Sequence, residues 1–278
     1  MPKVRFLDRR VIRLFLEYIS AISTALSLFL IFVDIPEKVK LLVGVIFVLG
    51  LIVSYIVLWL HSSTLENIDL NIEGSTVTIK TGDIFLEAGF KVIAFNEYFD
   101  TLVDNKVISD ESLNGIFINK LFPRSTQELD DHISSYHFDG EDVACDNNDR
   151  KFGKKRKYRI GTICLYNEYI LAAFSKFDDS NRALLTMPEY LEFLIKFWDK
   201  VNKVYAQKSV SVPIFGSGIT RIKEHRNISD EELLKIMLWT FRISEMRFKY
   251  PAKLAIVIHE SKINQINLLD IKSARNGL

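Results

Sequence analysis

Two long runs of apolar residues lie near the start of the chain, and each is long enough to cross a membrane. They extend from about residue 14 to 33 and from about 41 to 60, and a bilayer core needs roughly 20 residues of helix. Pro36 lies in the polar stretch between them, where it would end a helix and permit a tight turn. The pattern predicts a two-helix transmembrane hairpin within residues 1–61. The alternatives are a cleaved signal peptide and a buried hairpin of a soluble protein, but a second span follows almost at once and favours the membrane.

Basic residues lie mainly before the first apolar run. Five Lys or Arg residues precede it, whereas the turn between the runs holds two lysines together with Asp34 and Glu37. The positive-inside bias therefore predicts a cytoplasmic N-terminus, and an even number of spans returns the chain to the same side. We expect a multi-pass protein of the cell inner (plasma) membrane, with residues 62–278 forming a cytoplasmic domain.

From residue 62 onward the pattern changes to short segments. Alternation of apolar and polar residues predicts strands, and amphipathic runs that begin at Pro188 and Ser229 predict helices ending near Tyr205 and Phe248. A further helix is expected over 124–136. Loops are expected over 100–122, where Gly115 between hydrophobic residues would suit a loop on the phosphate side of a ligand, and over 139–157. The basic run of the second loop could touch anionic lipid or phosphate but is more simply a solvated loop. The predicted strands are 68–72, 76–80, 91–95, 159–165, 169–174, 210–213 and 253–259. Strands and helices alternate in the C-terminal half, so we expect an α/β domain with a mixed sheet flanked by helices.

Composition narrows the function only slightly. A net charge of +1 gives nucleic-acid binding no electrostatic support. The two cysteines, Cys145 and Cys164, are too few for a disulfide framework or a four-ligand zinc site. The five histidines have no metal-ligand spacing, and the sequence contains neither a Gly-x-Ser-x-Gly elbow nor a Walker loop. No metal site and no catalytic residue is predicted.

Three predicted strands end in residues that could hold a nucleotide. Gly82-Asp83-Ile84 follows the first of these strands, Asn96 the second, and Phe-Gly-Ser-Gly-Ile-Thr at 215–220 the third. Ligands of α/β sheets bind beyond the carboxyl ends of strands, and a glycine-rich turn there exposes backbone N–H groups to a diphosphate. Taken alone, Gly-Ser-Gly is more typical of a structural turn. The order and spacing of the three segments together indicate a site.

This order resembles that of the macro domain, an ADP-ribose-binding module. Thr81–Ile84 is similar to the motif after its early strand, and Val92–Asn96 resembles the strand leading into its Asn-rich loop. Val212–Ile219 is similar to the later strand and loop that wrap the diphosphate. Two membrane spans before such a domain resemble the macro-domain form of the ThsA family, the transmembrane effectors of type II Thoeris anti-phage defence. In that family a TIR-domain partner makes an ADP-ribose-type signal from NAD, and the membrane part kills or arrests the cell.

The resemblance implies a role for each candidate residue. Asp83 and Ile84 would bind adenine, the glycine turn the diphosphate, and Asn96 with Thr220 the distal end of the ligand. The predicted ligand-binding residues are Asp83, Ile84, Asn96, Phe215, Gly216, Ser217, Gly218, Ile219, Thr220 and Arg221. The implied ligand is an ADP-ribose derivative, in particular histidine-linked ADP-ribose, and no cofactor is expected. Its binding would trigger membrane disruption and abortive infection, and a homo-oligomer is expected because two helices from one chain cannot line a pore.

One departure from the macro-domain pattern bears on catalysis. The macro-domain loop commonly reads Asn-Ala-Ala-Asn, and its second Asn helps hydrolytic members to handle the distal ribose. Here the run is Asn96-Glu97-Tyr98-Phe99, and a phenyl ring supplies none of the hydrogen bonds of an amide. Binding without turnover is therefore predicted, and the protein is not expected to be an enzyme. The alternatives are a membrane-anchored ADP-ribosyl hydrolase or phosphatase, and a membrane scaffold that binds no nucleotide.

Overall fold

The computed structural model describes residues 4–33, 35–178, 181–225 and 227–273, which form two compact units. The first unit contains the N-terminal residues up to Glu66 together with the segment that begins at Ile266, and the second runs from Asn67 to Gln265. Lys3 and Asp34, which enter the charge comparison above, lie outside the described residues.

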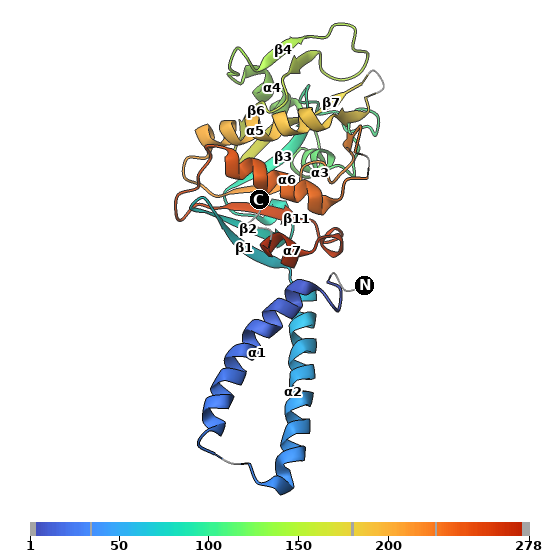
Figure 1. Ribbon diagram of the computed structural model, residues 1–278. Coiled ribbons are helices and arrows are strands. Elements are labelled where there is room, and N and C mark those ends of the chain that lie inside the picture. The colour runs from blue at the N-terminus through green and yellow to red at the C-terminus, as the bar shows by residue number, and fades with distance from the viewer. Residues whose placement is uncertain (1–3, 34, 179–180, 226, 274–278) are drawn as a thin grey trace. The chain divides into compact units, whose positions relative to one another are not determined.

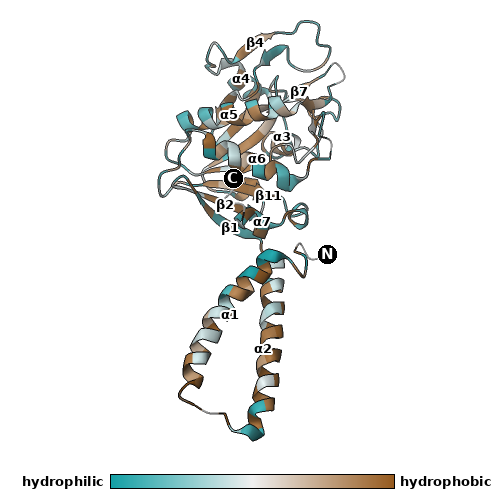
Figure 2. Cartoon of the chain, in the orientation of Figure 1, coloured by the Kyte–Doolittle hydropathy of each residue, from teal (hydrophilic) through white to brown (hydrophobic). Residues whose placement is uncertain are grey.

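Two helices dominate the first unit. α1 spans Arg9–Leu30 and α2 spans Glu37–Ser63, and both are long and apolar enough to cross a membrane. Their side chains are almost entirely exposed within the structure, whereas the hairpin of a soluble core would be buried. Figure 2 shows the apolar character of α2 along most of its length. α1 begins before the apolar run because the Asp8 carboxylate accepts a hydrogen bond from the backbone N–H of Arg10 at 2.8 Å and caps the helix.

The segment before α1 is fixed by contacts inside the same unit. The indole N–H of Trp59, near the end of α2, donates to the backbone carbonyl of Val4 at 3.0 Å. Val4 and Val11 form a buried cluster with Leu269, which belongs to the short helix α7 (Leu268–Ser273). The residues on either side of the candidate spans are therefore tied together by packing as well as by the chain.

The second unit is a mixed sheet flanked by helices, as predicted (Figure 1). Its strands are β1 (Asn67–Ile72), β2 (Ser75–Thr81), β3 (Phe90–Asn96), β6 (Ile163–Tyr166), β7 (Tyr169–Phe177), β8 (Ala183–Leu185), β9 (Val210–Pro213), β10 (Arg221–Ile222) and β11 (Leu254–Ile258). They are ordered β1-β2-β11-β9-β3-β7-β8-β10, with β6 beside β7. β2, β11, β9, β3 and β7 pair in parallel, so their carboxyl ends meet at one edge of the sheet. β1, β6 and β8 are antiparallel to their neighbours β2 and β7.

Alternating side chains of the central strands pack against different helices. The helices are α3 (Leu113–Leu121), α4 (Gln127–Ser135), α5 (Met187–Val204) and α6 (Asp230–Ile243), with short turns η1 (Ile84–Leu86) and η2 (Ile263–Gln265). Phe95 of β3 packs against Phe117 of α3 with ring centroids 6.0 Å apart. Phe174 of β7 packs against Phe193 of α5 at 4.8 Å. Period-two alternation along these buried strands thus supplies two apolar faces, one for each layer of helices.

Three predictions about secondary structure were wrong. The predicted loop 139–157 contains most of an antiparallel pair, β4 (Val143–Asp146) and β5 (Arg156–Tyr158). Most residues of this pair are exposed and polar, so they lack the alternation of apolar and polar positions that predicts a half-buried strand. α6 ends at Ile243 rather than near Phe248, because the chain turns and the Phe248 N–H donates to the Ser75 hydroxyl at 2.9 Å. Helix α3 lies within 100–122, where only a loop was expected.

Gly89 offers a test of how β3 is placed beside β9. It has φ of +79°, and a Cβ at this position would lie 2.3 Å from the backbone oxygen of Ser209, which also accepts a hydrogen bond from the Phe90 N–H at 2.9 Å. Gly89→Ala is expected to lower the free energy of unfolding by about 2 kcal/mol or more, because neither the left-handed backbone nor the clash can relax cheaply. The measurement is denaturant unfolding of the full-length protein in detergent.

Gly140→Ala is the matched control for this substitution. A Cβ at Gly140 meets nothing within 4 Å, and the backbone there is not left-handed, so its free energy of unfolding should change by less than about 0.5 kcal/mol. Equal losses in the two variants would contradict the close approach of Gly89 to Ser209.

Candidate functional site

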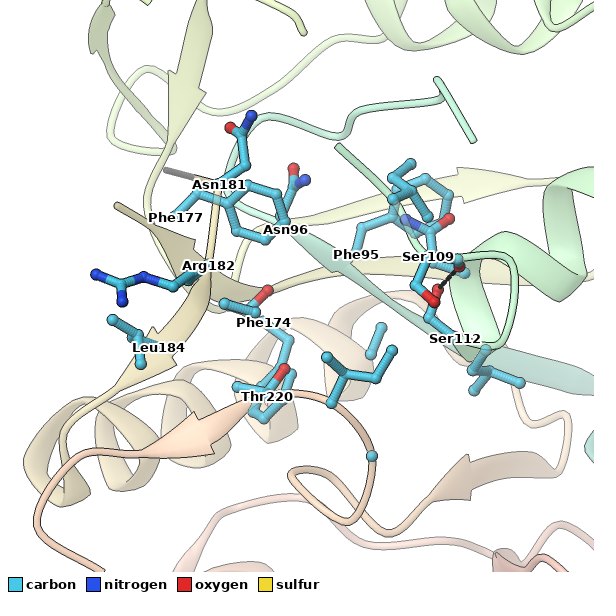
Figure 3. A pocket seen from close by; sticks show the side chains of 18 of the residues that line it. Phe95, Asn96, Ser109, Ser112, Phe174, Phe177, Asn181, Arg182, Leu184 and Thr220 are labelled. Carbon is cyan, nitrogen blue, oxygen red and sulfur yellow. Dashed lines mark hydrogen bonds between the residues drawn. The ribbon is translucent and has the colours of Figure 1, made fainter. Parts of the chain in front are cut away.

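A cavity of about 1370 Å³ lies at the carboxyl ends of β9, β3 and β7 (Figure 3). Its described lining comes from the ends of these strands, from the loop before α3 and the start of that helix, from residues 181–184 and from residues 214–220, together with Phe152 and Lys223. Pockets for drug-sized ligands usually measure about 300–1000 Å³, so this cavity has room for a nucleotide. Its position at the carboxyl ends of parallel strands is the one that the sequence predicts for a ligand.

The glycine turn after β9 is held by the aromatic core beneath it. The Phe215 ring is buried, with its centroid 4.8 Å from that of Phe193 on α5. Burial raises the pKa of Tyr190 far above its ordinary value, so its hydroxyl stays protonated and donates to the Phe215 carbonyl at 3.0 Å. Gly216 then adopts φ of +86°, while a Cβ on Gly218 would meet nothing within 4 Å. The chain therefore presents residues 216–220 along the cavity on a rigid base.

Asn96 lies at the centre of the site, at the end of β3. It is buried, and its side-chain oxygen accepts hydrogen bonds from the backbone N–H groups of Tyr98 at 3.0 Å and Asp100 at 3.3 Å. Its amide nitrogen donates to the Asp100 carboxylate at 2.9 Å. One hydrogen of that nitrogen remains without a partner among the described residues, and Asn96 lines the cavity.

The loop before α3 and the first residues of that helix form a wall of the cavity, within the segment 100–122 that was expected to be a loop. The Ser112 hydroxyl donates to the Ser109 carbonyl at 2.6 Å and accepts from the Gly115 N–H at 3.0 Å, which fixes the start of α3 at the cavity (Figure 3). Asn114 also lines the cavity, and its buried side-chain oxygen has no hydrogen-bond partner in the described structure. A Cβ on Gly115 would lie 2.1 Å from the Ser109 oxygen, so Gly115 is required for close packing. The glycine between apolar residues was the only sequence signal of this wall.

Basic side chains outnumber acidic ones around the cavity. The charged residues in its described lining are Lys106, Glu111, Arg182 and Lys223. The Arg182 Nε also pairs with the Asp178 carboxylate at 2.7 Å. An excess of positive charge favours an anionic ligand. The backbone of Arg221, in β10, pairs with that of Leu184 in β8, but the Arg221 side chain lies outside the described residues.

Asp83 and Ile84 lie away from the described lining of the cavity. β11 runs between β2 and β9, so Asp83 is separated by a strand from the glycine turn. The Asp83 carboxylate accepts from the Phe85 N–H at 2.9 Å and lies 3.9 Å from the Lys120 ammonium group. Ile84 is buried and packs beside Leu113, which lines the cavity. Of the predicted site residues, Asn96 and the run Phe215–Thr220 come together, while these two adjoin the cavity only through Leu113.

The residues after Asn96 turn into the core and away from the ligand space. Phe99 is completely buried with φ of +47°, and its ring centroid lies 5.1 Å from that of Tyr158. Burial raises the pKa of the Glu97 carboxyl, which accepts from the Phe177 N–H at 3.1 Å and faces the Lys157 ammonium group at 3.2 Å. Phe99 and Glu97 are therefore structural residues that do not line the described cavity.

The described residues offer no metal centre and no activated thiol. Among them no group of three or more His, Cys, Asp or Glu side chains could hold a metal ion. Cys164 is buried, which raises the pKa of its thiol to about 12 and keeps it protonated. Cys145 is exposed on β4, outside the described lining of the cavity.

Comparisons with known proteins place the chain in a family. The family model described as "Thoeris protein ThsA, Macro domain" matches residues 77–259. A curated relative, Thoeris protein ThsA of Bacillus amyloliquefaciens (strain Y2), is 39% identical over 280 residues, which cover 98% of this chain and 92% of the relative.

Solved structures are similar at a lower level. The Oceanobacillus iheyensis macrodomain with ADP is 14% identical, with 76% of this chain and 98% of that chain covered and a TM-score of 0.42. The same macrodomain with MES bound is 15% identical, with the same coverage and a TM-score of 0.41. These scores are too low to support an assignment, which rests on the family model and the curated relative. The chain belongs to the ThsA family of Thoeris proteins, and residues 77–259 are its macro domain.

Proposed function

We propose that this protein is a membrane effector of bacterial anti-phage defence whose macro domain senses an ADP-ribose-derived nucleotide. The observation that carries the proposal is the large cavity in which a glycine turn, an Asn96 amide and several basic side chains line one continuous space. A diphosphate needs N–H donors and positive charge close to a backbone without obstructing side chains. Membership of the ThsA family is consistent with this use of the cavity.

The order of the strands suggests how the ligand lies. Adenine would lie at the Leu113 end of the cavity, beside which Ile84 packs, the diphosphate would lie along Gly216–Gly218, and the distal ribose would reach Asn96 and Thr220. Beyond Asn96 the cavity continues to Asn181 and Arg182 (Figure 3). This further space supports a ligand that carries an additional group on the distal ribose, and histidine-linked ADP-ribose made by a TIR-domain partner is the form that we propose.

Binding without turnover is the favoured mode. Phe99 occupies the position at which hydrolytic macro domains place a second Asn, and its ring is buried in the core. Glu97 is also buried and held by hydrogen bonds, so it is poorly placed to move a proton on a ligand. ADP-ribosyl hydrolysis is the second candidate, and incubation of the full-length protein with ADP-ribosylated peptide followed by mass spectrometry would distinguish them. Release of free ADP-ribose would contradict the sensor.

In this proposal the two candidate spans act on the membrane when the ligand binds. We propose that the protein is a homo-oligomer of the inner membrane with its macro domain in the cytoplasm, and that ligand binding disrupts the membrane and ends in abortive infection. A ligand shifts such an equilibrium only by its differential affinity for the two states. The described side chains of α1 and α2 are largely exposed in one chain, which leaves apolar surface for lipid and for other subunits.

Gly218→Glu tests the nucleotide site directly. The added side chain has open space and no backbone strain, but its carboxylate would lie in the loop that lines the cavity. Calorimetry of the full-length protein in detergent should show ADP-ribose binding weakened at least about tenfold, because a carboxylate beside a diphosphate repels it. Gly140→Glu is the matched control, since it adds the same charge at an equally open glycine outside the described lining and should leave affinity unchanged. Equal affinity of both variants for ADP-ribose would show that the glycine turn does not contact the ligand.

Vesicle leakage tests the proposed output. The full-length protein would be reconstituted into phosphatidylethanolamine and phosphatidylglycerol vesicles that contain a self-quenching dye. Histidine-linked ADP-ribose should release the dye, and Gly218→Glu should require a correspondingly higher ligand concentration because the membrane responds only to the bound state. Leakage that is equally fast without ligand would contradict gating by the macro domain.

A further inference from the structure

A buried ion pair lies behind one end of the cavity. The guanidinium of Arg150 makes two parallel hydrogen bonds with the carboxylate of Asp100, at 3.0 and 2.7 Å. Both side chains are almost completely buried, and the guanidinium carbon lies 3.8 Å from the centroid of the Tyr98 ring. Removing two charges from water is costly unless their remaining hydrogen-bonding groups are satisfied. Such a pair therefore holds the groups bonded to it in a fixed arrangement.

Every acceptor position of the Asp100 carboxylate is occupied. One oxygen accepts from Arg150 and from the backbone N–H of Lys154 at 2.7 Å, and the other accepts from Arg150 and from the Asn96 amide at 2.9 Å. Gly153 makes the approach of this loop possible, because a Cβ there would lie 2.5 Å from the nearer Asp100 oxygen. The loop that contains Arg150 is thereby fastened to the turn that follows β3.

The same pair orients two amides that line the cavity. Asp100 accepts from the Asn96 nitrogen, and the second nitrogen of the Arg150 guanidinium donates to the side-chain oxygen of Asn181 at 3.1 Å. Because Arg150 can only donate, the Asn181 oxygen must face it and the Asn181 NH₂ group must face elsewhere. Both Asn96 and Asn181 line the cavity, and Figure 3 shows them on the same side of it, away from Ser109 and Ser112.

We propose that Asp100 and Arg150 are positioning residues that set the ligand specificity of this end of the cavity. They present the NH₂ groups of Asn96 and Asn181 to acceptor oxygens of the ligand, such as ribose hydroxyls or a carboxylate attached beyond them. The proposal rests on the nucleotide-sensing function above, in which the β7 side of the site receives the distal part of the ligand. It requires that the affinity for ADP, which lacks that part, does not depend on the Asp100–Arg150 pair.

Phe152 lies on the loop that the Asp100–Arg150 pair anchors. It is exposed at the tip of the loop fastened by Arg150 and Gly153, and it lines the cavity. An exposed aromatic ring on an anchored loop can cover a ligand group without the loop having to be ordered on binding. Lys154 adds to the anchoring of this loop, since its ammonium group pairs with Asp130 at 2.6 Å.

Calorimetry of the full-length protein in detergent with ADP and with ADP-ribose tests the proposal. Arg150→Met should weaken ADP-ribose binding about tenfold or more and change ADP binding less than about twofold. Asn181→Gly should act in the same direction without threatening the fold, because Asn181 already has φ of +55°, which glycine adopts freely. Arg150→Lys should rescue only partly, since an ammonium group cannot form the two parallel bonds.

Lys200→Met is the matched control. Lys200 also forms a largely buried ion pair, with Asp142 at 2.9 Å, but neither residue lines the described cavity. Its loss should lower the melting temperature and leave the ratio of the two affinities at the wild-type value. An unchanged ratio in Arg150→Met and Asn181→Gly, or an equal change in Lys200→Met, would overturn the proposal. If the wild-type protein bound ADP and ADP-ribose equally well, the distal role would fail while nucleotide sensing stood, and binding of neither would overturn both.

Discussion

The parallel pairing of β9, β3 and β7 is the constraint on which the site depends. Parallel strands bring their carboxyl ends to one edge, so residues more than a hundred positions apart in the chain, such as Asn96 and Gly216, line one cavity. The same pairing needs helices on both faces, because strands buried on two sides expose apolar residues in both directions. The aromatic contact of Phe193 with Phe215 shows how this packing reaches the ligand space, since the layer that covers the sheet also supports the glycine turn.

The two sides of the cavity are stabilised by different physical means. The glycine turn rests on apolar contacts and on a single hydroxyl, that of Tyr190, whose raised pKa keeps it a donor. The side beyond Asn96 rests on the Asp100–Arg150 pair, whose hydrogen bonds hold two loops and two amides. Apolar packing tolerates small shifts, whereas a buried ion pair is stable only when all its partners are in place. The part of the site with the strictest geometry is therefore the part most suited to discriminate between ligands.

Local patterns predicted seven of the nine strands of the main sheet and several residues that line the cavity, and they missed what depends on distant partners. Asn96 and Phe215–Thr220 could be predicted because each follows a strand with a clear hydrophobic pattern, and the edge where they meet follows from the α/β architecture. Helix α3 was not predicted because it is only nine residues long and because its N-cap, Ser112, follows a polar loop. Arg150 and Asp100 lie 50 positions apart, and no local period reveals that two charged residues in polar segments will be buried together. The separation of Asp83 from the glycine turn by β11 could not be read from strand order along the chain.

Under the proposed function, transmission from the macro domain to the membrane would require more than tight binding. The cavity belongs to the second unit and both candidate spans to the first, and the chain passes between the units after Glu66 and again after Gln265. Moving a two-state protein from about 1% to about 99% active requires roughly 10⁴-fold tighter binding to the active state. Contacts present in both states, such as those of a preformed glycine turn to a diphosphate, cannot supply that difference. It must come from groups that meet the ligand in only one state. Under the proposed function, that difference would therefore have to come from contacts of the distal group of the ligand rather than from contacts of its ADP part.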